Sequence, residues 1–149
     1  MDAPGPALSL DFGTRRIGLA VSDAEGRLAF PVGTLERRDL AADLEALRRL
    51  VSERGIRHLV LGLPLHMDGR AGDMARVVRD FARRLEGATG LTVELLDERW
   101  TTREAERALR EIGGRRGRRR RRGADVDSIA ATLLLRTWLE RRRVAPEGG

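Results

Sequence analysis

The alternation of apolar and polar residues predicts three strands near the start of the chain, over 7–12, 16–22 and 28–35. A glycine-containing turn at 23–27 separates the second run from the third. Alternating runs joined by so short a turn are typical of an antiparallel hairpin or meander. We therefore expect the first part of the chain to form an antiparallel sheet.

Apolar residues then recur at helical spacing over 40–51, which predicts an amphipathic helix. Asp39 is placed to cap the first turn of this helix, and Gly55 is placed to end it. A buried strand is predicted next, at 58–62, and a second amphipathic helix follows at 74–85. From this point helices alternate with strands.

The last third of the chain predicts one more strand, at 91–98. The segment 101–104 reads Thr-Thr-Arg-Glu, a capping-box pattern that opens a short helix. A final helix is predicted over 125–142, with Asp125 as its N-cap. Strands separated by helices pair in parallel through right-handed crossovers.

This order of elements predicts an α/β fold with a mixed five-stranded sheet and helices on both faces. The length of 149 residues suits a single domain over 1–149 that can bury a sizeable core. We expect loose ends at 1–6 and 143–149, and a mobile arginine-rich loop at 113–123.

Composition narrows the setting of the protein. The chain has no cysteine, which excludes disulfides and thiolate zinc sites. It has no apolar run long enough to span a membrane and no secretory leader, so we expect a cytoplasmic protein with no membrane partner.

Every basic residue is arginine, and the net charge is +6. A dense cationic block interrupts the second half of the chain, consisting of Arg115, Arg116, Arg118, Arg119, Arg120, Arg121 and Arg122. Guanidinium groups suit phosphates, so the block indicates contact with nucleic acid, although a solvated loop has the same composition. The scarcity of aromatic residues argues against a base-stacking platform.

Asp11 is the first candidate for a functional carboxylate. It lies inside the first predicted strand, on the face of Ala7 and Ser9. An ionised carboxylate in such a strand is unfavourable unless a cation or hydrogen bonds compensate it. One explanation is a bond to the turn amides of Gly13 and Thr14; the other is a functional site.

A second carboxylate stands at the end of the fifth predicted strand. Alternation places Asp97 with Leu95 and Glu98 with Leu96, so one of the two acids faces inward where α/β sheets hold their ligands. The pattern does not decide between them. The alternative is an ordinary polar strand exit, with Glu98 paired to Arg99.

The third carboxylate opens the last predicted helix. Asp127 shares a helical face with Ala131, Leu134 and Trp138, which form an otherwise apolar stripe. Small residues at 130 and 131 would let this helix approach the sheet closely. An acid on the buried side of a helix start indicates a ligand more than a cap.

Carboxylates from three remote segments, without cysteine, point to a hard cation such as Mg²⁺ or Mn²⁺; zinc does not fit. His58 and His66 are interpreted as structural or exposed residues. Acidic ligands combined with a cationic loop are suited to hydrolysis of phosphodiesters.

These segments also resemble a known family. LDFGTRRIGLAVSD at 10–23, GLPLHMDG at 62–69, DERWTT at 97–102 and VDSIAA at 126–131 are similar, in order and spacing, to motifs of the YqgF (RuvX) family. Its members are RuvC-like pre-16S rRNA nucleases, also called Holliday junction resolvases. The resemblance covers residues 7–141 and implies an RNase H-like fold, with three antiparallel strands followed by two parallel ones.

The resemblance further implies that Asp11, Glu98 and Asp127 form a metal-binding acidic centre, with Asp97 as a neighbour. In the two-metal arrangement that we expect, Asp11 would bridge two Mg²⁺ or Mn²⁺ ions, and each of the other two acids would complete one ion's ligands. The positions expected to line the cleft are Gly13, Thr14, Gly62, Pro64, Arg99 and Thr101. The chain departs from the family pattern in three places. The arginine loop is longer and consists more completely of arginine, and Arg70 and Trp100 replace other residue types.

The function expected from these observations is a metal-dependent nuclease that processes the 5′ end of pre-16S rRNA. The alternative within the family is resolution of branched DNA, and an alternative of another class is a non-catalytic nucleic-acid-binding scaffold. A sugar-kinase or actin-like ATPase also carries Asp-x-Gly-Thr after a strand, but this chain has no room for its second lobe. The expected partners are precursor rRNA or branched DNA and a pre-ribosomal particle, with the protein a monomer or a homodimer.

Overall fold

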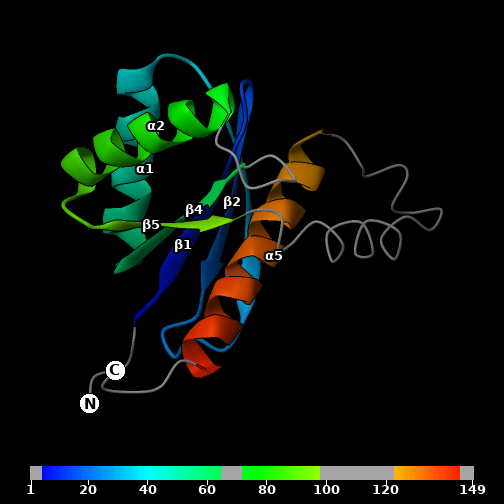
Figure 1. Cartoon of the computed structure of the whole chain (residues 1–149). Helices are drawn as coiled ribbons and strands as arrows, with labels where there is room; N and C mark the ends of the chain where they lie inside the picture. Colours follow the sequence, from blue (N-terminus) through cyan, green and yellow to red (C-terminus); the bar gives the residue numbers. More distant parts are fainter. Residues whose placement is uncertain (1–4, 65–71, 98–122, 145–149) are drawn as a thin grey trace.

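The computed structural model describes residues 5–64, 72–97 and 123–144, which form one mixed sheet covered by helices on both faces (Figure 1). The strands are β1 (Ala7–Phe12), β2 (Arg16–Ser22), β3 (Ala29–Glu36), β4 (His58–Leu63) and β5 (Val93–Asp97). The described helices are α1 (Leu40–Arg54), α2 (Asp73–Thr89) and α5 (Gly123–Val144). The predicted short helix after residue 101 lies outside the described residues.

The strand order in the sheet is β3-β2-β1-β4-β5. The β1–β2 and β2–β3 pairs are antiparallel, whereas the β1–β4 and β4–β5 pairs are parallel. Parallel neighbours need a crossover, and α1 and α2 supply the connections into β4 and β5. The predicted mixed five-stranded α/β fold, antiparallel first and parallel afterwards, is confirmed.

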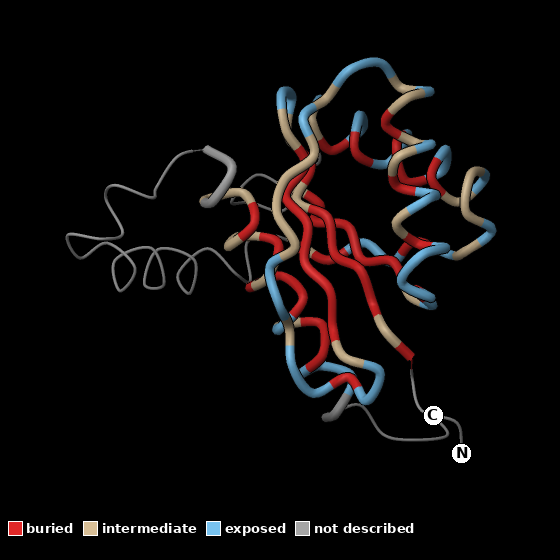
Figure 2. Tube along the Cα trace, turned by 180° about the vertical axis from the view of Figure 1, so that it is seen from behind, coloured by how far each residue is buried: buried red, intermediate tan, exposed pale blue. Residues whose placement is uncertain are grey.

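Each face of the sheet has its own apolar cluster, and the buried residues concentrate along the central strands (Figure 2). The larger cluster lies under α1 and α2 and takes Leu8, Leu10 and Phe12 from β1. The smaller cluster lies under α5, and its members are Ala7, Ala20, Val60, Leu96, Ala131, Leu134, Leu135, Trp138 and Leu139. Strand alternation therefore sorts the sheet residues between the two faces as the sequence predicts.

The predicted ends of α1 are confirmed. The Asp39 side chain accepts a hydrogen bond from the Ala42 amide at 2.8 Å, as an N-cap does. Gly55 adopts a left-handed conformation with φ of 62°, and its N–H donates to the Ser52 carbonyl oxygen. Capping therefore sets the length of the helix that leads into β4.

Three predicted boundaries need correction. Helix α5 already includes Gly123, so Asp125 lies within the helix and is not its N-cap, and Gly123 does not belong to the predicted loop. The same helix continues to Val144, into the predicted loose end. At the other end, the Gly5 N–H donates to Ala24 O and the Pro6 carbonyl accepts from the Arg57 amide, so both residues are bonded rather than loose.

In the described residues, no helix combines the length and apolar composition of a membrane span.

Candidate active site

Helix α5 makes a very close approach to the sheet at Gly18 of β2. A Cβ atom at this position would lie 2.0 Å from the backbone oxygen of Asp127 and 3.0 Å from its Cβ. Glycine fits here because any side chain would overlap the helix backbone in a tightly packed interior. The missing side chain thus lets the first turns of α5 lie directly on β2.

Serine hydroxyls hold α5 in this position. Ser128 Oγ donates to the Leu19 carbonyl oxygen at 3.2 Å and accepts from the Gly33 amide at 3.3 Å. Ser9, which is fully buried, donates from Oγ to the Ala131 carbonyl oxygen at 2.6 Å. These bonds satisfy the buried hydroxyls and tie the start of the helix to β1, β2 and β3.

Asp11 lies on the same face of the sheet. The register of β1 and β2 pairs Asp11 directly with Gly18. Residues paired across antiparallel strands present their side chains to the same face, with Cβ positions about 5 Å apart. Because a Cβ at Gly18 would point at Asp127, the partly buried Asp11 lies on the part of the sheet face that the start of α5 covers. The fold therefore brings two of the predicted carboxylates together from opposite ends of the chain.

The turn after β1 bears on the alternative explanation of Asp11. The Gly13 N–H donates to the Arg16 carbonyl oxygen at 2.9 Å, a backbone bond that closes the turn between β1 and β2. The backbone therefore uses the Gly13 amide in closing the turn, and the predicted bond from Thr14 to Asp11 stays a prediction.

Asp127 also has a basic partner, which the sequence analysis missed. Arg16 Nε donates to Asp127 Oδ2 at 3.0 Å, and the two side chains are 37% and 28% exposed. Alternation along β2 puts Arg16 on the face of Gly18 and Ala20, under α5. That alternation was the signal for an arginine directed toward the acidic face.

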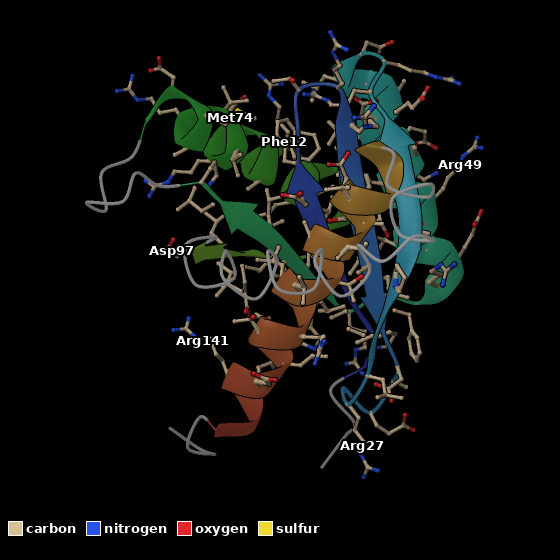
Figure 3. All side chains as sticks on the ribbon, turned by 90° about the vertical axis from the view of Figure 1, so that its right-hand side faces the viewer. Phe12, Arg27, Arg49, Met74, Asp97 and Arg141 are labelled. Carbon is tan, nitrogen blue, oxygen red and sulfur yellow. The ribbon has the colours of Figure 1, made fainter. Side chains whose placement is uncertain are left out.

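Asp97 lies on the opposite face. It is the last residue of β5 (Figure 3). It pairs with Leu63 of β4, which belongs to the cluster under α1 and α2. Residues paired in adjacent strands share a face, so Asp97 does not join Asp11 and Asp127. Glu98, the other acid of the pair, lies outside the described residues.

Besides Gly13, three of the positions expected to line the cleft are described. Gly62 pairs with Leu96 of the α5 cluster and therefore shares the face of Asp11. Pro64 follows β4 and is partly buried, and Thr14 is exposed. Further predicted positions lie outside the described residues, namely His66, Arg99, Thr101, Arg115, Arg116, Arg118, Arg119, Arg120, Arg121 and Arg122.

His58 fits the structural interpretation. It opens β4, at the end of the strand away from Gly62, and its ring lies 5.5 Å from that of Trp138. Arg142 Nη1 lies 3.3 Å from His58 Nδ1, and its guanidinium stacks on the Trp138 ring. These contacts bind the end of α5 to the sheet, on the face that carries Asp11 but at its opposite end.

An ion pair with the buried acid Asp43 supports the turn before Arg16. The Arg37 guanidinium donates to Asp43 Oδ2 at 3.3 Å and to the Gly13 carbonyl oxygen at 3.4 Å, and it lies 4.4 Å from the centre of the Phe12 ring. Asp43 is 1% exposed and also accepts from the Arg38 amide at 3.0 Å. Helix α1 is thereby linked to the end of β1, beside Asp11.

We expect Asp43→Ala to lower the free energy of unfolding by about 3 kcal/mol, because it leaves Arg37 and the Arg38 amide without their buried acceptor. Urea denaturation followed by circular dichroism measures the change. Glu45→Ala on the same helix is the control, since the Glu45–Arg48 pair is exposed and should change stability little. Equal effects of the two substitutions would contradict the assignment.

The oxygen donors of this face suit a hard divalent cation. Asp11 and Asp127 supply carboxylates, the ligand type that Mg²⁺ and Mn²⁺ take and that zinc sites use less. Over residues 5–64, 72–97 and 123–144, no cluster of three or more acidic or histidine side chains suited to holding a metal ion is found. The described residues therefore contain two of the three acids that the sequence analysis expects to bind the metal, and carboxylate oxygens are ligands that such an ion accepts.

The fold is that of RuvC-like proteins. The structure of RuvC from Thermus thermophilus, solved in complex with a Holliday junction substrate, superposes with a TM-score of 0.60 over 95% of this chain and 98% of that one. A second Thermus thermophilus RuvC structure gives the same TM-score, over 93% and 96%. Both are 12% identical in sequence, so the likeness concerns the fold.

Sequence comparison then identifies the family. The RuvX family, described as Holliday junction resolvase, matches residues 5–141. A Moorella thermoacetica protein named "Putative pre-16S rRNA nuclease" is 46% identical over 90% of this chain and 94% of its own length. An Anaeromyxobacter protein of the same name is 47% identical over 91% and 96%. The chain belongs to the RuvX family, as its motifs indicated.

Proposed function

We propose that this protein is a metal-dependent nuclease that processes the 5′ end of pre-16S rRNA in the cytoplasm. The observation that carries the proposal is the pairing of Asp11 with Gly18 under Asp127, which gathers two acids on the α5 face of a RuvC-like sheet. The names of the relatives from Moorella and Anaeromyxobacter support rRNA as the substrate.

Three acids of the chain would hold Mg²⁺ or Mn²⁺ in this proposal. Asp11 and Asp127 contribute from β1 and α5, and Glu98 is included because the sequence places it directly after β5. Asp97 is left out because it lies on the other face. Bound divalent ions would polarise the scissile phosphate and activate water.

The remaining residues would bind and orient the substrate. Arginines 115–122 would hold the phosphate backbone in a salt-dependent and largely sequence-independent manner. Gly13, Thr14, Gly62 and Pro64, with Arg99 and Thr101, would line the path of the strand. The fixed positions of β1 and α5 would keep the two acids oriented without rearrangement in the reaction.

A second candidate substrate is branched DNA. The RuvX family is described as Holliday junction resolvase, and the superposed RuvC structure was solved with such a junction. A homodimer would suit a symmetric junction, whereas a monomer suffices for one RNA end. The candidate of another class is a scaffold that binds RNA within a pre-ribosomal particle without cutting it.

Cleavage assays with matched substrates test the proposal. We expect the wild-type protein to shorten a 16S precursor carrying its 5′ leader in Mg²⁺ or Mn²⁺, and to leave it intact in chelator. The rate should fall as salt rises, because counterions compete for the phosphates. Mature 16S rRNA without the leader is the control substrate.

Two outcomes would contradict the proposal. Faster cleavage of a four-way DNA junction than of the rRNA precursor would favour the resolvase. Equal RNA binding with and without chelator, and no hydrolysis with either ion, would favour the scaffold. Depletion in cells should lead to accumulation of precursor if the rRNA assignment is correct.

A further inference from the structure

Arg16 is a basic side chain in contact with Asp127 of the proposed metal site. Its Nε atom lies 3.0 Å from Asp127 Oδ2, within hydrogen-bond distance. A charge-assisted hydrogen bond of this kind is directional and restricts the rotation of the carboxylate it holds. The question is whether this contact positions the acid for a cation or competes with the cation for it.

The backbone of Arg16 is fixed on both sides. Its carbonyl oxygen accepts a hydrogen bond from the Gly13 amide at 2.9 Å. On the other side of β2, Arg16 pairs with Glu36 of β3. The preceding residue, Arg15, accepts from the Arg37 amide at 2.9 Å. The guanidinium therefore extends from a well-supported strand end rather than from a free loop.

The backbone of Asp127 is fixed as well. The neighbouring Ser128 bonds to β2 and β3, and Ser9 bonds to the next turn of α5. With both backbones held, the side-chain torsions of Asp127 are what remains to be set. The bond from Arg16 sets them.

Arg16 and the other acid, Asp11, lie at different positions on this face. Arg16 precedes Gly18 by two residues on β2, toward the turn, whereas Asp11 lies across from Gly18 on β1. One carboxylate oxygen bonded to Arg16 leaves the second oxygen to accept other partners.

We propose that Arg16 is a positioning residue for Asp127: it holds Oδ2 so that the other oxygen of the carboxylate is presented to a divalent cation. This inference rests on the proposed function, which makes Asp127 a metal ligand. Hydrogen bonds from outer residues to ligating carboxylates commonly change metal affinity about tenfold or more. If the guanidinium instead competes with the cation for Asp127, removal of Arg16 should raise the metal affinity rather than lower it.

Binding of Mn²⁺ alone, measured by isothermal titration calorimetry, distinguishes the two roles. Arg16→Met removes the guanidinium and keeps an apolar stem. Removal of a positive charge by itself tightens cation binding, through Coulomb attraction. We expect about tenfold weaker Mn²⁺ binding instead, which only a loss of positioning explains.

Arg15→Met is the matched control. It removes the same charge from the adjacent position, where the side chain is exposed. We expect this variant to bind Mn²⁺ as well as the wild type or slightly better. Arg16→Lys, which keeps the charge but loses the planar Nε donor, should fall between the wild type and Arg16→Met.

Melting in chelator checks folding independently of the metal. The three arginine variants should melt close to the wild type, because the Arg16–Asp127 pair is partly exposed. Should Arg16→Met fail to fold, Arg16→Lys carries the test, and unchanged Mn²⁺ affinity in that variant would overturn the proposal. Tighter or unchanged binding by a folded Arg16→Met would overturn it as well.

Asp127→Asn separates this inference from the proposed function. Wild-type Mn²⁺ affinity in Asp127→Asn would mean that Asp127 is not a ligand, and both proposals would fail. Loss of binding in Asp127→Asn with no weakening in Arg16→Met would leave the metal site in place and reject the role of Arg16 alone.

Discussion

Asp11→Asn is expected to lower the rate of phosphodiester cleavage about a thousandfold, equivalent to about 4 kcal/mol of transition-state stabilisation. The change keeps the shape of the side chain and removes its negative charge, which the proposed divalent ions require. Single-turnover cleavage of the rRNA precursor measures the effect, with binding to the RNA followed separately.

Stability should respond differently from activity. Asp11 and Asp127 are like charges on one face of the sheet, so loss of one should leave the melting temperature in chelator unchanged or raise it. Asp97→Asn is the matched control, because Asp97 is an acid at the end of a neighbouring strand but on the other face. Full turnover in Asp11→Asn, or equal losses in both variants, would remove Asp11 from the mechanism.

Gly18→Ala should lower both the stability of the fold and the activity. Its new Cβ would lie 2.0 Å from the backbone oxygen of Asp127, so α5 must move away from β2. Such a shift breaks the serine bonds and opens the apolar cluster under the helix, and we expect a loss of about 3 kcal/mol. Urea denaturation measures it, and cleavage should fall as well because Asp127 leaves Asp11.

Gly87→Ala is the control for this substitution. Gly87 lies in α2, and a Cβ there meets no atom within 4 Å. Alanine favours a helix over glycine by about 1 kcal/mol, so this variant should be as stable as the wild type or more stable. If Gly18→Ala proved equally stable, the close approach of α5 to β2 would be incorrect.

The sequence was sufficient to predict the faces of the strands. Alternation put Asp11 with Ala7 and Ser9, and the structure has these β1 residues under α5. The helical stripe of Asp127, Ala131 and Trp138 was likewise predicted, and the latter two are buried against the sheet. Local periodicity determines such faces because it depends only on backbone geometry.

Which side chains meet could not be predicted from periodicity. The proximity of Asp11 to Asp127 depends on the register of β1 with β2 and on the docking of α5 at Gly18. The choice between the acids at 97 and 98 needed the pairing of Asp97 with Leu63. Both are tertiary facts, set by packing rather than by any local pattern.

The misplaced helix start has a local cause. Asp125 was assigned as an N-cap because aspartate is favoured there, but aspartate is also favourable within the first turn of a helix. The helix already includes Gly123, so Asp125 lies after its first residue and is not the N-cap. The alternation along β2 indicates the face of Arg16, but its bond to Asp127 depends on the docking of α5, which no local pattern gives.

The bond between Ser9 and Ala131 spans 122 residues, and this separation affects the protein during its own synthesis. Ribosomes add roughly 5–20 residues per second, so the β1–β2 hairpin emerges many seconds before α5 exists. Until the last helix has been translated, Asp127 is missing from the face of the sheet that carries Asp11. In the proposed mechanism, a nascent chain would therefore lack one of its metal ligands until α5 has been made.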